Sequence, residues 1–149
     1  RYSDNTAYQM LFDTFGTAHF NETAKQAGAS LRLGSYVFGE TSAADMAKLY
    51  LDLYRYNGIY RDFLLQEMEN NTSRNFIAAG VPKGIRVVNK YGSGSNMTLG
   101  YHDSAIIFTD VPCVLVIYTT FNFDRNYDKV PFHEIAARVV EINRQVEYF

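Results

Sequence analysis

The sequence predicts an α/β protein of the α+β type, in which an antiparallel sheet carries helices on both of its faces. Apolar residues recur at helical spacing through residues 1–80, at strand spacing from residue 86 to residue 120, and at helical spacing again near the end of the chain. The last predicted strand is apolar at consecutive positions, and a strand sustains this only when both faces of its sheet are covered. Helices are therefore expected on both sides of the sheet.

The first helix is predicted from its start and stop signals. Ser3 or Asp4 is a suitable N-cap, and Gly16 is a suitable stop. Between them the apolar residues follow helical spacing: Ala7, Met10, Leu11 and Phe15. A shorter helix is predicted over residues 20–27, ahead of Gly28, and residues 29–40 give no regular pattern.

The most regular helical pattern begins at Thr41 or Ser42. Ser42 is followed three residues later by Asp45, which resembles a capping box. The apolar stripe of this helix consists of Met46, Leu49, Tyr50, Leu53 and Tyr54. Two further helices are predicted over residues 61–69 and 73–79.

After Pro82 the pattern changes to three consecutive antiparallel strands, over residues 86–90, 101–109 and 113–120. A last helix, with Pro131 as its first residue, is predicted to cover the sheet with the face that carries Ile135, Val139, Ile142 and Val146. Three strands leave at least one edge open, and an apolar open edge invites pairing. A partner strand from outside these residues is therefore expected.

Composition restricts the possible functions. The 149 residues suit one domain, residues 1–149, and 47% hydrophobic with 20% charged residues is typical of a globular protein. The net charge is −2 without a basic run, so no nucleic-acid partner is expected. No apolar stretch approaches the ~20 residues of a membrane span. The single cysteine, Cys113, lies in an apolar run, and the three histidines lack partners at ligand spacing, so neither a metal nor a cofactor is expected.

Lys90 is the first candidate functional residue. It lies where an apolar strand runs into a Gly/Ser-rich turn, so a cation and free backbone N–H groups share one strand edge. That combination suits a carboxylate or a developing oxyanion, although it is also an ordinary way to end a strand. His102 and Asp103 look like half of a catalytic triad, but adjacent strand residues point to opposite faces, and a role at the edge of the ladder is predicted instead.

Two tripeptides carry a family resemblance: Ser3-Asp4-Asn5 at a helix start and Lys90-Tyr91-Gly92 on a strand, with a mostly helical stretch between them. Their order resembles that of the penicillin-recognising serine enzymes, the class A β-lactamases and the transpeptidase-like penicillin-binding proteins. The flanking segments 2–7, 41–47, 101–107 and 116–120 agree, so the likeness covers nearly the whole chain. The resemblance implies a β-lactamase/transpeptidase-like fold.

The resemblance also implies catalytic and substrate-binding roles. Ser3 relays a proton toward the leaving group, and Asn5 binds the carbonyl of the substrate's side-chain amide. Lys90 supplies positive charge near the substrate carboxylate and holds the Ser3 hydroxyl. Gly92 permits close approach of the substrate, and the backbone N–H of Ser93 is one of two oxyanion donors. The alternative for Ser3 and Asn5 is plain helix capping.

The chain departs from the family pattern at the nucleophile. The family's nucleophile is the serine of a Ser-x-x-Lys motif N-terminal to Ser3, and here only Arg1 and Tyr2 precede Ser3. The chain is therefore expected to be the C-terminal part of a β-lactamase-like domain. The missing N-terminal segment is its expected partner, with the nucleophile, the lysine base and the second oxyanion N–H.

Two further departures concern deacylation and substrate binding. Class A β-lactamases position a hydrolytic water with a Glu-x-x-x-Asn motif, and the best candidate here, Glu40, is followed four residues later by Ala44. The position of Tyr91 usually holds threonine or serine, whose hydroxyl contacts the ligand's carboxylate. The phenol of Tyr91 either reaches further, turns away or blocks the groove, and Ser93 and Ser95 are the substitute donors.

The expected function is serine acyl transfer on β-lactams or on D-Ala-D-Ala peptidoglycan stem peptides, through an acyl-enzyme that deacylates weakly. One alternative is a catalytically silent homologue that binds cell-wall peptide or another protein. A second is an independent α/β interaction domain that matches the motifs by chance. An extracytoplasmic location, secreted or anchored to the cell envelope, is implied by the family alone.

Overall fold

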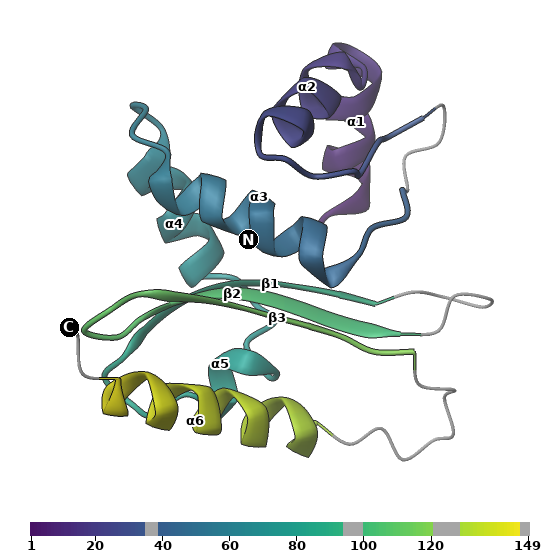
Figure 1. Cartoon of the computed structure of the whole chain (residues 1–149). Helices are drawn as coiled ribbons and strands as arrows, with labels where there is room; N and C mark the ends of the chain where they lie inside the picture. The colour runs from purple at the N-terminus through teal and green to yellow at the C-terminus, as the bar shows by residue number, and fades with distance from the viewer. Residues whose placement is uncertain (35–38, 94–99, 121–128, 147–149) are drawn as a thin grey trace.

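Helices cover both faces of a three-stranded antiparallel sheet in the computed structural model, which describes residues 1–34, 39–93, 100–120 and 129–146 (Figure 1). The α/β architecture predicted from the sequence is confirmed. Within the described residues the helices are α1 (Asn5–Phe15), α2 (Ala18–Gln26), α3 (Ala43–Arg55), α4 (Arg61–Glu69), α5 (Ile77–Gly80) and α6 (Val130–Gln145).

The sheet has the order β1-β2-β3, with β1 (Arg86–Ser93), β2 (Tyr101–Phe108) and β3 (Cys113–Tyr118). Both pairs are antiparallel, and Lys90 lies opposite Ser104 in the register of β1 and β2. Helices α3 and α4 lie on one face and α5 and α6 on the other (Figure 1). The strand β2 is therefore central and covered on both sides.

Two helix caps fix the start of α1 and of α3. The Asp4 carboxylate accepts hydrogen bonds from the backbone N–H groups of Thr6 (2.8 Å) and Ala7 (3.0 Å). Ser42 accepts one from the N–H of Asp45 at 3.1 Å, as the sequence predicted. Since Asp4 caps α1, the hydroxyl of Ser3 is not the capping group.

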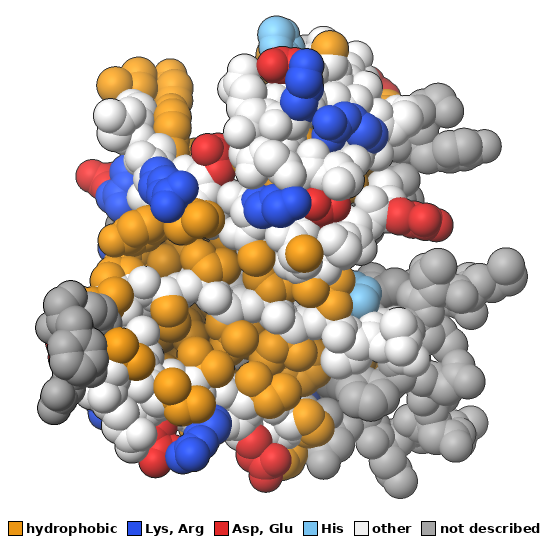
Figure 2. Space-filling model, viewed as in Figure 1, with side chains coloured by type: hydrophobic (Ala, Val, Ile, Leu, Met, Phe, Trp, Pro, Cys, Tyr) orange, Lys and Arg blue, Asp and Glu red, His pale blue; other side chains and the backbone are white. Residues whose placement is uncertain are grey.

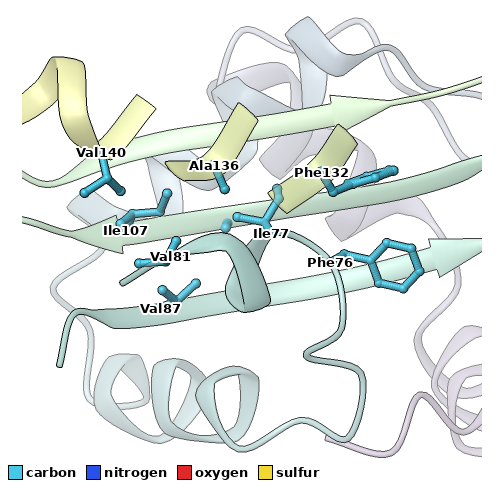
Figure 3. Close-up of a cluster of buried hydrophobic side chains, with 9 residues drawn as sticks. Phe76, Ile77, Val81, Val87, Ile107, Phe132, Ala136 and Val140 are labelled. Atoms are coloured by element: carbon cyan, nitrogen blue, oxygen red, sulfur yellow. The ribbon is translucent and has the colours of Figure 1, made fainter. Parts of the chain in front are cut away.

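Each face of the sheet has its own apolar core. On one face Val88 and Ile106 pack with Tyr50 of α3 and Leu65 of α4. On the other, α5 and α6 enclose a larger cluster, which Figure 3 shows between these helices and the sheet. Its buried members are Phe76, Ile77, Val81, Val87, Ala105, Ile107, Phe132, Ala136 and Val140.

Two predictions about helices were wrong. The helix predicted over residues 73–79 begins only at Ile77, because Asn71 and Arg74 ahead of it extend side chains to β1 instead. The predicted inner face of α6, with Ile135, Val139, Ile142 and Val146, is not the buried one. The residues that α6 buries are Phe132, Ala136 and Val140 (Figure 3).

Several apolar side chains stay exposed. In α1, which buries no residue, Met10 is 64%, Leu11 57% and Phe15 65% exposed. On α6, Ile135 and Ile142 are also exposed. Figure 2 shows hydrophobic side chains gathered at the level of the sheet, between the upper helices and α6. The apolar side chains on this face are therefore clustered and not scattered singly.

Candidate active site

The structure brings Ser3 and Lys90 together. The ammonium Nζ of Lys90 lies 2.9 Å from the hydroxyl Oγ of Ser3, although 87 positions separate the two residues. Side chains alternate along a strand, so Lys90 shares the sheet face of Val88, the face covered by α3 and α4. The contact therefore joins the start of α1 to the last part of β1.

Ser3 has an unusual backbone conformation at this contact. Ser3 has a φ of 56°, in the left-handed region that a non-glycine residue seldom adopts. An ammonium group only donates hydrogen bonds, so Lys90 donates to Ser3 Oγ. The proton of the Ser3 hydroxyl is then free to be donated to another acceptor.

Burial and charge act in opposite directions on Lys90. Desolvation by the surrounding protein lowers the pKa of the Lys90 ammonium, and the negative charge of Asp103 raises it. The ammonium also donates to the carbonyl oxygen of Tyr91. Lys90 is thus a cation held by its own strand and by Ser3.

Asp103 is fully buried, with an exposed fraction of 0%. Its carboxylate accepts hydrogen bonds from the Ile77 backbone N–H (3.0 Å) and from the Asn89 amide (3.1 Å). Desolvation raises the pKa of Asp103 to about 6, and these hydrogen bonds oppose the rise. The predicted role at the edge of the ladder is wrong for Asp103, because β2 is the central strand.

Side chains close one half of the outer edge of β1. Arg74 donates to the carbonyl oxygen of Val87 at 3.1 Å, and Asn71 donates to that of Asn89 at 3.0 Å. Backbone groups of alternate residues point to the same side of an antiparallel strand, so those of Tyr91 and Ser93 also face outward. Side chains therefore cover the outer edge of β1 at Val87 and Asn89. The rest of this edge, at Tyr91 and Ser93, lies beside Lys90.

Asn71, Arg74 and Asn89 were missed in the sequence. The available signal was the presence of Asn89 and Asp103 inside two apolar strand segments, at positions where a buried polar group needs a partner. Nothing in the local pattern indicated that the partner of β1 would be the connection between α4 and α5.

The other predicted site residues lie as follows. Asn5 is the exposed first residue of α1. Gly92 is exposed on the Lys90 side of β1, where an added Cβ would meet no atom within 4 Å. Ser93 ends β1. Ser95 lies outside the described residues.

Tyr91 turns away from Lys90. Its ring stacks on Phe76, with 4.2 Å between the ring centroids, and lies 6.0 Å from the ring of Tyr101. Burial raises the pKa of the Tyr91 phenol, and the neighbouring side chain of Ser93 acts in the opposite direction on this pKa. The sequence left three orientations open for Tyr91, and in the structure its side chain turns away, to the face of the sheet opposite Lys90.

The described residues contain neither a metal-binding cluster nor a membrane-spanning helix. Over residues 1–34, 39–93, 100–120 and 129–146, no three histidine, cysteine or acidic side chains are grouped so that they could hold a metal ion. None of the helices in those same ranges is long and apolar enough to cross a membrane.

Solved structures of β-lactamases resemble this fold. A β-lactamase from Desulfarculus baarsii superposes with a TM-score of 0.80 at 25% identity, covering 95% of this chain and 60% of its own. An ancestral class A β-lactamase gives 0.78 at 25%, covering 94% and 61%. A mutant of PBP-A, solved as an acyl-enzyme complex with penicillin G, gives 0.76 at 20%, covering 97% and 58%. This chain thus spans about three-fifths of the length of the structures it matches.

The family assignment comes from a sequence model. No curated protein sequence matches the chain. The model of the beta-lactamase enzyme family, in contrast, matches residues 1–142, which is most of the 149-residue chain and includes Ser3, Lys90 and all three strands. The chain belongs to the beta-lactamase enzyme family.

Proposed function

We propose that this chain is the substrate-binding and proton-relaying part of a serine acyl-transfer domain. The substrate is a β-lactam or the D-Ala-D-Ala end of a peptidoglycan stem peptide. The observation that carries the proposal is the 2.9 Å contact between Lys90 Nζ and Ser3 Oγ, beside the open part of the β1 edge. A hydroxyl that accepts from an ammonium keeps its own proton for donation to a leaving nitrogen.

The proposed acylation step moves one proton along a short path. A serine from a segment N-terminal to Ser3 attacks the substrate carbonyl, and its proton passes to a lysine of the same segment. When the carbonyl C–N bond breaks, the nitrogen takes the proton of the Ser3 hydroxyl, and Ser3 takes the proton held by that lysine. Lys90 stays charged throughout, so it stabilises the substrate carboxylate and orients Ser3.

Substrate binding uses the open part of β1. An extended ligand adds to a strand edge by backbone hydrogen bonds. The carbonyl oxygens of Val87 and Asn89 already accept from Arg74 and Asn71, and that of Tyr91 accepts from Lys90. The proposed ligand therefore bonds to the N–H of Tyr91 and to Ser93. The N–H of Ser93 is the proposed oxyanion donor. Gly92 has no side chain to fill the Lys90 side of this edge. Asn5 is proposed to bind the side-chain amide of the substrate.

The exposed apolar surfaces support a larger domain. We assign them to the N-terminal segment that carries the Ser-x-x-Lys motif. Strand β3 pairs with β2 on one side, and beside it Ile135 and Ile142 of α6 are exposed. A strand laid along β3 would pair its backbone and bury those side chains. The matched structures are longer than this chain, which agrees with this assignment.

Deacylation is proposed to be slow. A hydrolytic water needs a base, and Glu40 is an exposed residue in the segment ahead of α3, with Ala44 where the motif has asparagine. The acyl-enzyme should therefore persist. An extracytoplasmic location is part of the proposal, because the substrates named here are cell-wall peptides and the drugs that mimic them.

Intact-mass spectrometry on the full-length protein with penicillin G tests this function. A stable increase by the mass of the drug is expected, and the Ser3→Ala and Lys90→Met variants should acquire it at least tenfold more slowly. Lys48→Met is the matched control, because Lys48 binds Gly28 and Asp45 away from the site. Rapid release of the adduct would overturn slow deacylation.

A catalytically silent homologue is the second candidate. Tyr91 favours it, because its phenol faces away from Lys90 and leaves the substrate carboxylate without the hydroxyl that relatives of this family usually supply there. Titration calorimetry with a D-Ala-D-Ala peptide separates the two candidates. Binding without any penicillin adduct would identify a binder, whereas an adduct excludes the silent homologue.

A further inference from the structure

We propose that Asp103 is a positioning residue for Lys90, acting through Asn89 and the backbone of β1. The inference rests on the proposed function of Lys90 as the cation that orients Ser3 and the substrate carboxylate. Asp103 touches neither of them: it lies on the central strand, opposite Tyr91 in the register, with its carboxylate on the face away from Lys90.

The first support is the direct link from Asp103 to the residue before Lys90. Asn89 Nδ2 lies 3.1 Å and 3.3 Å from the two carboxylate oxygens of Asp103, and the Ile77 N–H lies 3.0 Å from one of them. Asn89 and Asp103 are both fully buried. Buried polar groups of this kind impose one arrangement, because any unpaired member would be costly.

The second support is that the Asn89 amide has only one possible orientation. Its Oδ1 accepts from Asn71 at 3.0 Å and from Arg74 at 3.4 Å, while its Nδ2 donates to Asp103 and to the carbonyl of Ser73 at 3.2 Å. A flipped amide would turn its NH₂ group toward two donors and its oxygen toward a carboxylate. The strand is therefore clamped at the position immediately before Lys90.

The third support is electrostatic. The charge of Asp103 acts on Lys90 in the direction that keeps the ammonium protonated, against the effect of burial. The charge of Asp103 also acts on the phenols of Tyr50 of α3 and Tyr91 of β1, and burial raises the pKa of each phenol. Neither phenol supplies a second negative charge near neutral pH.

The cationic and titratable side chains of the neighbouring elements have other partners than Asp103. Arg74, in the connection between α4 and α5, reaches Asp103 only through Asn89. Lys129, the N-cap residue of α6, lies over the ring of Phe76, and His133 of α6 is hydrogen-bonded to the carbonyl of Asn75 at 2.9 Å. Lys90 is the cation whose attraction lowers the pKa of Asp103, so the two groups are coupled in both directions.

The coupling predicts a change in pH dependence that a purely structural role would not produce. Removing the negative charge with Asp103→Asn lowers the pKa of Lys90, so the loss of acylation at alkaline pH should begin on the order of 0.5–1 pH unit lower. A merely destabilising substitution would reduce the amount of folded protein and leave the position of that limb unchanged.

The experiment measures the rate of penicillin G acylation against pH for the full-length protein and for Asp103→Asn. Asp45→Asn is the matched control, because Asp45 is another buried carboxylate that accepts a backbone N–H, from Ser30 at 2.9 Å. A shifted alkaline limb for Asp103→Asn alone supports the proposal. An unshifted limb, or an equal shift for both variants, overturns it.

A second measurement keeps the proposal testable if Asp103→Asn does not fold. Carbon-13 NMR of the Asp103 carboxyl follows its titration in the full-length protein and in Lys90→Met. Loss of the ammonium should raise the midpoint of Asp103, and an unchanged midpoint overturns the proposal. NMR needs no acylation, so failure of the proposed function is recognised separately, by an unmodified wild-type protein that still has the coupled titration.

Discussion

Arg74 donates a hydrogen bond of 3.1 Å to the backbone carbonyl of Val87, on the outer edge of β1. Together with the bond from Asn71 to the Asn89 carbonyl, it replaces a neighbouring strand over this half of the edge. The Lys90 end of the same edge receives no such side chain from residues 71–76 in the described structure. The connection between α4 and α5 thus closes one half of the edge at which the ligand is proposed to bind.

Asn71→Ala tests this closure. The substitution leaves the carbonyl and Oδ1 of the fully buried Asn89 with fewer donors, so the free energy of unfolding should fall by about 1–3 kcal/mol. Urea denaturation measures the loss. Gln9→Ala, which removes an exposed hydrogen bond to Asp13 within α1, is the control and should change stability by less than about 0.5 kcal/mol. Equal effects of the two substitutions would contradict the closure.

Ser3 should be strained at its φ of 56°. Ser3→Gly and Ser3→Ala both remove the hydroxyl, but only glycine adopts this backbone without cost, so the glycine variant should be more stable than the alanine variant by about 1 kcal/mol. At Gln9, in the middle of α1, the same pair of substitutions should rank in the opposite order. Guanidinium denaturation of the four variants measures both differences. A Ser3→Ala variant at least as stable as Ser3→Gly would rule out the strain.

The burial of Asp103 should make stability depend on pH. Burial raises the pKa of Asp103 from the ordinary 3.8 to about 6 in the folded protein, so the folded state binds the proton more tightly than the unfolded state does. This contribution to stability is complete below about pH 4 and is lost as the pH rises through 6, a change of about 3 kcal/mol. Asp103→Asn should flatten the stability profile between pH 4 and pH 7, measured by denaturation at fixed pH. A slope that survives the substitution would assign it to other groups.

Gly92 should matter for the ligand and not for folding. An added methyl group meets no atom within 4 Å but projects to the Lys90 side of β1, so Gly92→Ala should keep its stability within about 0.5 kcal/mol and slow penicillin acylation by about tenfold or more. Gly80→Ala is the opposite control, since its Cβ would collide with the backbone of His133. That variant should lose about 1–3 kcal/mol of stability. Wild-type acylation by Gly92→Ala would argue against substrate at this edge.

Tyr91→Thr distinguishes obstruction from packing. The phenol lies on the face opposite Lys90 and stacks on Phe76, so its removal should not speed acylation. The loss of the stacked ring should instead lower the unfolding free energy by about 1–3 kcal/mol. Faster acylation by the threonine variant, measured with penicillin G on the full-length protein, would mean that the phenol obstructs the ligand after all.

Much of the fold was predictable because the local signals agree with the tertiary structure. The bounds of α4 and the cap of α3 were predicted correctly, and each strand begins at its predicted residue. The inner face of α6 was not, since apolar residues occur on two of its faces and periodicity alone does not tell which one meets the sheet. The face that meets the sheet is the one whose Phe132 packs into the buried cluster with Ile77 of α5.

One part of the candidate site was predicted from the sequence and another part was not. The approach of Ser3 to Lys90 followed from the order of two short motifs, because the family resemblance carries information about contacts 87 positions apart. Asp103 and Asn89 were not assigned to the site, since their importance lies in a hydrogen-bond network that includes Asn71 and Arg74 from another part of the chain. No local pattern encodes such a network.

The absence of buried residues in α1 has a consequence for how often the proposed relay is assembled. Little apolar burial holds this helix in place, so its detachment is a local opening that needs less free energy than global unfolding. The time-averaged occupancy of the Ser3–Lys90 contact then follows this local equilibrium rather than the melting temperature. Any segment that buries Met10, Leu11 and Phe15 would raise that occupancy. The proposed proton transfer would then become faster, although none of the residues that carry it is changed.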